Sequence, residues 1–113
     1  MKLVYQNPQA LTIVESSAEE MDIGSYGRKW VNFMKRCHPN LVREMLRKGT
    51  FYEVAQSVDD RAWEYDEFLT KQYMDTHPCP NTFEENVKYH TTKKFYINGA
   101  VMREKVLIPY TSV

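Results

Sequence analysis

The stretch from residue 23 to residue 41, IGSYGRKWVNFMKRCHPNL, holds the residue types best suited to chemistry in this chain. Gly24 and Gly27 stand three residues apart and lead directly into Arg28 and Lys29. Backbone N–H groups of a glycine-rich loop at a helix N-terminus can bind a phosphate group. The spacing, however, fits neither a P-loop nor the three-glycine dinucleotide fingerprint. We therefore predict that Gly24 permits a tight turn at the start of a helix and that Gly27 lets Tyr26 or a neighbouring helix pack closely.

A concentration of positive charge follows the two glycines. Residues 28–48 contain seven basic residues and one acidic residue, in a chain whose formal net charge is zero. Because the apolar positions of this segment point inward, most of the basic side chains must share the outer surface. Such a surface suits a nucleic-acid backbone, an acidic protein partner, or plain solvation. The predicted basic patch comprises Arg28, Lys29, Lys35, Arg36, Arg43, Arg47 and Lys48.

Two helices joined near His38-Pro39 would also suit a helix-turn-helix. The second helix is short, and beyond Asn40 it offers no Asn or Gln side chain for reading adenine edges. Sequence-specific reading of DNA is therefore not the leading interpretation.

The next segment has the opposite charge, since residues 49–80 contain seven acidic residues and two basic ones. These carboxylates can neutralise the basic helices within one bundle, dock onto another copy of the chain, or mimic a phosphate backbone toward a nucleic-acid enzyme. The predicted acidic face comprises Glu53, Asp59, Asp60, Glu64, Asp66 and Glu67.

Metal binding and catalysis have weaker support. Cys37-His38 and His77-x-Cys79 supply zinc-type ligands at two helix ends, which lie on the same side if the helices alternate in direction. Adjacent Cys and His residues rarely bind one ion together, however, and the separation does not fit a zinc finger. No hydrolase or metalloprotease motif is present, and His90 has no nucleophile pattern near it. We predict no metal, no cofactor and no enzymatic activity.

Helical periodicity positions these residues. The spacing of the apolar residues, at three, four and seven positions, predicts a first helix from about Ser25 to Cys37. Pro39 suits the first turn of a short second helix, which Gly49 ends. Thr50, with Glu53 in the capping-box position, opens a third and longest helix that continues to about residue 76.

The two ends of the chain are less regular. LVYQ and ALTIV flank a turn at residues 7–9 and predict a β-hairpin or an extended arm. The segment 77–80, HPCP, breaks the chain before a second capping box, Asn81 with Glu84, which opens another helix at Thr82. Asn98-Gly99 then favours a two-residue β-hairpin turn, while a continuous helix from residue 82 to about residue 107 is the competing interpretation.

We expect a mainly α fold, a small bundle of about four helices with an N-terminal β-hairpin or arm. The alternative is an α+β fold in which residues 92–108 form a β-hairpin. A chain of 113 residues is expected to be one domain, with an arm at 1–22, a three-helix core at 23–76 and a C-terminal element at 81–108. Without a long apolar run or a signal peptide, we expect a cytoplasmic protein with free thiols and no membrane contact.

The stretch IGSYGRKWVNFMKRCHPNLVREMLRKGTFYEV, continuing through VDDRAWEYDEFLTKQ, resembles the small transposon-encoded proteins of the TnpV type. In that family a Gly-x-x-Gly and a basic residue open a helix, followed by a basic turn with proline, a short helix ending in Gly, and a long helix. The resemblance covers residues 23–73 and returns at AVMREKVLIPY. It implies a bacterial mobile-element origin and a helical fold, including the C-terminal segment, and brings no catalytic residues with it.

Our leading functional hypothesis is a small, non-enzymatic binding protein from a mobile genetic element that contacts a host or element protein. Predicted exposed aromatic residues suit a protein surface, namely Tyr26, Trp63, Tyr73 and Tyr96. A nucleic-acid-guided defence nuclease is the target class suggested by the mobile-element context, which would make the protein an anti-CRISPR-like inhibitor. The alternative is a DNA-binding accessory factor of the transposon that uses the basic helices 28–48. A homo-oligomer held by the opposite charges is a further expectation.

Overall fold

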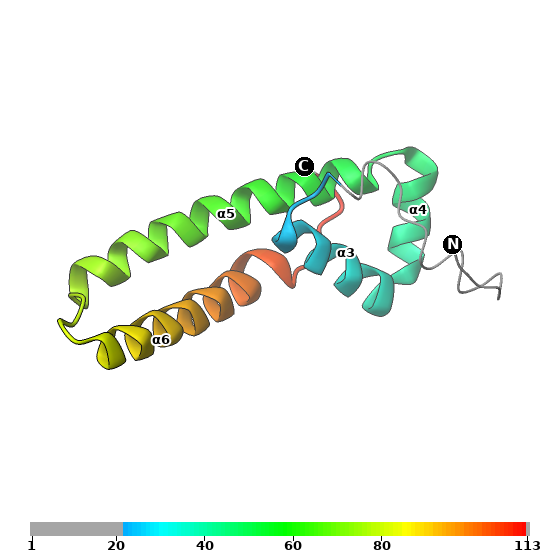
Figure 1. Ribbon diagram of the computed structural model, residues 1–113. Helices are drawn as coiled ribbons and strands as arrows, with labels where there is room; N and C mark the ends of the chain where they lie inside the picture. Colours follow the sequence, from blue (N-terminus) through cyan, green and yellow to red (C-terminus); the bar gives the residue numbers. More distant parts are fainter. Residues whose placement is uncertain (1–21, 113) are drawn as a thin grey trace.

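The computed structural model describes residues 22–112, which are mostly helical (Figure 1). The prediction of a mainly α fold is confirmed. The β-hairpin or arm predicted for residues 1–22 lies outside the described residues, apart from Asp22. The elements are α3 (Ser25–Cys37), α4 (Pro39–Lys48), α5 (Phe51–Thr76), α6 (Phe83–Val101) and the π-helical turn η1 (Met102–Val106).

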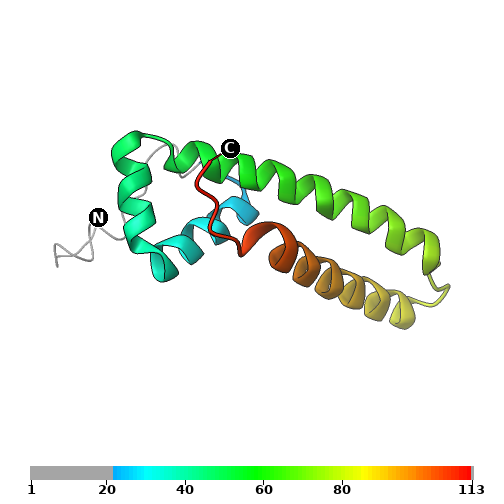
Figure 2. The same ribbon diagram turned by 180° about the vertical axis from the view of Figure 1, so that it is seen from behind.

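The long helix α5 organises the molecule. Helix α3 runs antiparallel to its first half, since Trp30 packs on Phe51 at one end and Tyr26 reaches Asp66 at the other. Helix α4 lies across the end of this pair, and α6 returns along the second half of α5 (Figures 1 and 2). The molecule is consequently elongated, with extents of 53 × 33 × 22 Å. Within residues 22–112, no helix combines the length and apolar character that a bilayer crossing needs.

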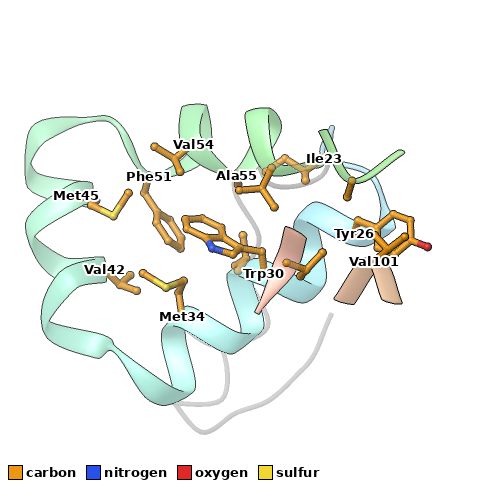
Figure 3. Close-up of a cluster of buried hydrophobic side chains, with 14 of the residues drawn as sticks. Ile23, Tyr26, Trp30, Met34, Val42, Met45, Phe51, Val54, Ala55 and Val101 are labelled. Atoms are coloured by element: carbon orange, nitrogen blue, oxygen red, sulfur yellow. The ribbon is translucent and has the colours of Figure 1, made fainter. Parts of the chain in front are cut away.

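The core sits where α3, α4, the first half of α5 and the end of α6 meet (Figure 3). Trp30 is at its centre, fully buried, with its ring 5.3 Å from that of Phe51. Met34, Val42 and Met45 close the side toward α4 (Figure 3). These residues occupy the apolar positions that define one face of each amphipathic helix, so burial of that face is what joins the helices.

The turn between α4 and α5 follows from Gly49. Its φ of 77° is left-handed, and its N–H donates to the Leu46 carbonyl while the next N–H, of Thr50, donates to the Met45 carbonyl. This double closure is the usual glycine-dependent helix end. The Thr50 hydroxyl also turns back to the Met45 carbonyl, at 3.4 Å. The predicted capping box with Glu53 is therefore wrong: Thr50 has helical backbone angles and its side chain caps no N–H of α5.

The C-terminal segment is helical, so the β-hairpin alternative for residues 92–108 is wrong. The Asn98-Gly99 pair lies inside α6, where Ile97, Ala100 and Val101 are buried against the core. Burial of these three side chains at helical spacing outweighs the local turn preference of Asn-Gly.

The start of α6 is shifted by one residue from its prediction. The cap is Thr82, whose hydroxyl oxygen accepts from the N–H of Glu85 at 3.3 Å and donates to the Glu85 carboxylate at 3.1 Å. The predicted pair was Asn81 with Glu84. A threonine with a glutamate three residues on satisfies the same rule one position later.

The end of α6 widens into η1, where the Leu107 N–H reaches back five residues to the Met102 carbonyl. This wider turn brings Val106 fully into the core. It also delivers the Ile108 carbonyl to the Trp30 indole N–H, which donates to it at 2.8 Å. The last described segment is thereby attached to the centre of α3.

Burial divides the molecule into two regions. We call residues 22–69 with 97–112 the head. From here on, the arm means residues 70–96 and not the N-terminal arm predicted for residues 1–22. All the buried side chains of the described chain belong to the head, while none between Thr70 and Tyr96 is buried. The arm is held by partial contacts at its tip, where Tyr89 donates its hydroxyl to the His77 carbonyl at 2.5 Å and Tyr73 stacks on the His77 ring.

Candidate interaction surfaces

The N-terminus of α3 is an anion site that the protein fills with its own carboxylate. Asp59 of α5 is 6% exposed, and its Oδ1 accepts from the N–H of Gly27 at 3.0 Å. A carboxylate at this position is favoured both by the free N–H groups of the first turn and by the helix dipole. The glycine-rich stretch therefore binds a negative group, but an internal one.

The two glycines make room for that carboxylate. A Cβ atom on Gly24 would stand 2.6 Å from Asp59 Oδ2, and one on Gly27 would stand 2.2 Å from Ile23 Cγ2 and 2.9 Å from the Ala55 carbonyl oxygen. Helix α3 can approach α5 this closely only without side chains at both positions. The prediction that Gly27 permits close packing of a neighbouring helix is confirmed.

A second acidic residue is engaged in the same way. Asp66 Oδ2 accepts from the Tyr26 hydroxyl at 2.6 Å, and its Oδ1 accepts from Thr70 at 3.3 Å. Burial of the ring raises the pKa of Tyr26 well above its ordinary value, and the hydrogen bond to Asp66 adds to this. Tyr26 is only 3% exposed, so its predicted place among the exposed aromatic residues is wrong.

Four of the six predicted acidic residues remain on the surface. Asp59 and Asp66 turn toward α3, which corrects the prediction of one continuous exposed face. The other four recur at intervals of seven, four and three residues, which places them along one side of a helix. We call them the acidic stripe of α5: Glu53, Asp60, Glu64 and Glu67, all exposed.

The seven predicted basic residues are all exposed, on α3 and α4. Lys29 lies beside the start of α3, with its ammonium 5.6 Å from the centre of the Tyr26 ring. On α4, Arg47 and Lys48 both pair with Glu44, at 2.5 and 3.7 Å, while Arg43 donates to Asn40. The basic residues are thus distributed over two helices, α3 and α4, that lie across one another (Figure 1).

The comparisons with known proteins bear on the origin of this arrangement. The model of the family described as transposon-encoded protein TnpV matches residues 5–107. The chain belongs to the TnpV family. The match extends the resemblance seen over residues 23–73 in both directions and identifies a transposon-encoded protein. Neither the search of curated proteins nor the search of solved structures found a match to this TnpV chain.

The zinc-type residues of this TnpV chain are far apart. Cys37 and His38 lie at the junction of α3 and α4, whereas His77 and Cys79 lie at the tip of the arm, at the opposite end of the molecule (Figure 1). The prediction that the three helices alternate in direction, which would put the ends of the first and third on the same side, is wrong. Helix α4 crosses the bundle, and α5 runs antiparallel to α3. Among residues 22–112, no group of three potential metal ligands is found together. Both cysteines are free and exposed.

Trp63 and Tyr96 are exposed as predicted, at 47% and 53%, and Tyr73 is half-buried.

The helical periodicity of α5 also contains a signal for the buried carboxylate of Asp59, which the prediction of an exposed acidic face did not use. Asp59 is four residues after Ala55 and three before Ala62, both on the apolar face of α5, so its side chain borders that face.

Proposed function

We propose that this transposon-encoded protein acts without catalysis, by binding another protein along the hairpin of α5 and α6. The observation that supports this is the position of its exposed apolar residues. Among the described residues, seven of the nine large apolar side chains that are exposed belong to these two helices: Trp63, Phe68, Met74, Phe83, Val87, Phe95 and Tyr96. Large apolar and aromatic side chains gathered on one region are typical of protein interfaces.

The acidic stripe supports a particular class of partner. Glu53, Asp60, Glu64 and Glu67 extend along one side of α5, next to the exposed Trp63. A row of carboxylates along a rigid rod resembles the charge of a phosphate backbone and attracts a protein with a basic nucleic-acid channel. The partner we propose is a host or element protein that handles nucleic acid. Since a mobile element gains from blocking host defence, a nucleic-acid-guided defence nuclease is the foremost candidate, and the protein would be an anti-CRISPR-like inhibitor of it.

Affinity capture from a bacterial lysate, with and without nuclease treatment, tests the mode of action. The wild-type chain is compared with Glu64→Lys, which reverses the stripe, and with the control Glu84→Lys, which makes the same change at the exposed start of α6. A protein captured after nuclease treatment, and lost with Glu64→Lys alone, supports the proposal. Capture of nucleic acid alone contradicts it.

Co-expression with candidate defence nucleases tests the narrower proposal. Inhibition should be dose-dependent and should weaken with Glu64→Lys. If every nuclease retains full activity at excess protein, the inhibitor role is wrong, while a protein partner of another kind stays open to the capture experiment.

The alternative proposal, a DNA-binding accessory factor, is favoured by the surface of α4. Arg43 and Arg47 are one turn apart and exposed. If they contact a DNA backbone, Arg43→Glu with Arg47→Glu abolishes duplex binding and flattens its salt dependence. Unchanged duplex binding by this variant would exclude the patch as the contact surface.

The opposite charges of α4 and α5 also suit association of two copies. Sedimentation at low and high salt measures this directly. A dimer held by these charges dissociates as the salt concentration rises, because screening weakens exposed ion pairs.

A further inference from the structure

A pocket of about 580 Å³ opens where the first turn of α3, the middle of α5 and the second half of α6 meet. Its walls come from three helices, so no single stretch of the sequence predicts this pocket. The volume lies within the range of about 300 to 1,000 Å³ that small-molecule sites occupy. The residues that matter for its chemistry are Lys29, Trp63, Asp66, Lys93 and Lys94.

The charge of the pocket favours an anion. Lys29 comes from α3, and Lys93 and Lys94 come from α6. Among the described residues that line the pocket, Asp66 is the one carboxylate, and both of its oxygens already accept hydrogen bonds, from Tyr26 and Thr70. Three ammonium groups against one engaged carboxylate leave an excess of positive charge in a chain whose formal net charge is zero.

The apolar wall of the pocket favours a flat ring. Trp63 is 47% exposed, although its indole is held at one side by the buried Tyr26 ring, with centroids 4.7 Å apart and planes at 66°. Tyr26 is itself anchored by the hydrogen bond to Asp66, so the indole has a rigid neighbour. A base that stacks on an aromatic side chain gains about 1–3 kcal/mol. Lys29, over the Tyr26 ring, places an ammonium beside this aromatic pair.

We propose that this pocket binds a nucleotide, with the base stacked on Trp63 and the phosphate held by Lys29, Lys93 and Lys94. The ligand is either a free mononucleotide or one nucleotide of a single strand, since both present the same base and phosphate. The pocket contains none of the four stripe carboxylates, and of the seven exposed apolar residues in the proposed protein-binding surface it shares Trp63 alone. The nucleotide proposal does not require the protein-binding proposal to hold.

Binding here also has a structural consequence, because the ligand bridges α3 and α6. Helix α6 contributes only Ile97, Ala100 and Val101 to the buried core, all in its last turns. A nucleotide between Lys29 and the α6 lysines adds a contact further along the helix. The backbone amides of residues 88–96 should therefore exchange with deuterium more slowly when the ligand is bound.

The chain carries its own optical reporter for this test. Trp30 is fully buried and donates its indole N–H to Ile108, so its fluorescence reports the integrity of the fold. Trp63 is exposed at the pocket, so a stacked base quenches its emission. The titrants are AMP, inorganic phosphate and a short single-stranded oligodeoxyadenylate, and calorimetry measures the same affinities independently.

We expect saturable quenching by AMP or by the oligonucleotide, with inorganic phosphate binding more weakly than either. Lys94→Glu should weaken nucleotide binding about tenfold or more, which is a loss of about 1.4 kcal/mol or more. The matched control is Lys88→Glu, an identical change at an exposed position of α6 that does not line the pocket. Trp63→Ala should weaken the binding of AMP but leave the affinity for inorganic phosphate unchanged.

Binding of AMP identifies a free nucleotide as the ligand, whereas binding of the oligonucleotide alone identifies a nucleotide within a strand. Three results overturn the proposal. One is the absence of saturable binding by AMP and by the oligonucleotide to folded protein at low salt. Another is equal weakening by Lys94→Glu and Lys88→Glu, which indicates general charge attraction. The third is inorganic phosphate binding as tightly as AMP, which would show that the base contributes nothing to the affinity.

Discussion

The head and the arm share the helices α5 and α6, but the two regions are stabilised differently. In the head, α5 is covered by α3, α4 and η1, and Phe51, Val54 and Val58 are at most 1% exposed. In the arm, α5 and α6 pack mainly on each other within the described part of the chain, and large side chains such as Phe83 and Phe95 are exposed. Two antiparallel helices offer each other one face, so an apolar residue outside that contact has nothing to cover it. The head therefore holds the buried core, while the arm leaves its large apolar side chains exposed.

The sharpest way to test this contrast between covered and uncovered side chains is to remove each tryptophan in turn, one buried at the centre of the head and one exposed on its surface. Trp30→Ala deletes the centre of the head and should lower the free energy of unfolding by about 3–5 kcal/mol. Trp63→Ala removes a side chain that is 47% exposed and should cost about 1 kcal/mol. Urea unfolding followed by circular dichroism measures both. Equal losses in the two variants would contradict the contrast.

A pair of glycines gives the next largest difference. Gly27→Ala forces a Cβ into Ile23 and the Ala55 carbonyl, so α3 must move away from α5, at a cost of about 2–3 kcal/mol. Gly99→Ala meets only the Arg103 guanidinium, at 3.4 Å, and replaces a poor helix former. It should stabilise the protein by up to about 1 kcal/mol. Thermal unfolding of the two variants gives opposite shifts, and a stabilising Gly27→Ala would disprove the close approach of α3 and α5.

The hydrogen bond between Tyr26 and Asp66, two residues that line the pocket, gives a pH-dependent difference. Tyr26→Phe removes the hydroxyl and should cost about 1–2 kcal/mol at neutral pH. Burial, together with Asp66, raises the pKa of Tyr26 above the 10.0 of an exposed tyrosine. The folded state holds the phenol proton more tightly, so this stability is complete below pH 10 and declines as the pH rises above it.

Unfolding free energies of wild type and Tyr26→Phe, measured over a pH series, therefore differ by a constant amount up to about pH 10 and converge above it. A difference that stays constant at higher pH would mean that the phenol proton is not held by the fold.

The smallest effect is expected in the arm. Phe95 is 84% exposed, so Phe95→Ser should change the free energy of unfolding by less than about 0.5 kcal/mol. The measurement is a urea titration at two protein concentrations. A larger loss that grows with protein concentration would show that a second copy covers this face.

Sequence periodicity was sufficient for the limits of the first three helices. The first helix spans Ser25–Cys37 as predicted, Pro39 and Gly49 mark the limits of the second, and Thr76 ends the third. These limits depend on local backbone chemistry, namely a missing N–H at proline and a left-handed glycine, which a single residue type reveals.

Features that depend on tertiary contact were harder to predict. Asn98-Gly99 has a turn preference that burial of Ile97 and Val101 overrides, and the direction of α5 depends on how the short α4 crosses the bundle. The same limit applies to the candidate sites. Asp59 and Asp66 look like surface charges until α3 is packed on them, and the pocket combines side chains from three separate helices.

The close approach of α3 and α5 links residues that are 32 positions apart in the chain. The close approach depends on Gly24, Gly27 and Asp59 together. The carboxylate of Asp59 needs the space that the glycines leave, and the N–H groups in the first turn of α3 need the carboxylate as an acceptor. In descendants of this sequence Gly24 and Asp59 should therefore change together. A lineage that replaces Asp59 by a small apolar residue relaxes the constraint on Gly24, whereas Gly27 stays constrained by Ile23 and the Ala55 carbonyl. A lineage that keeps Asp59 should tolerate no side chain at either glycine.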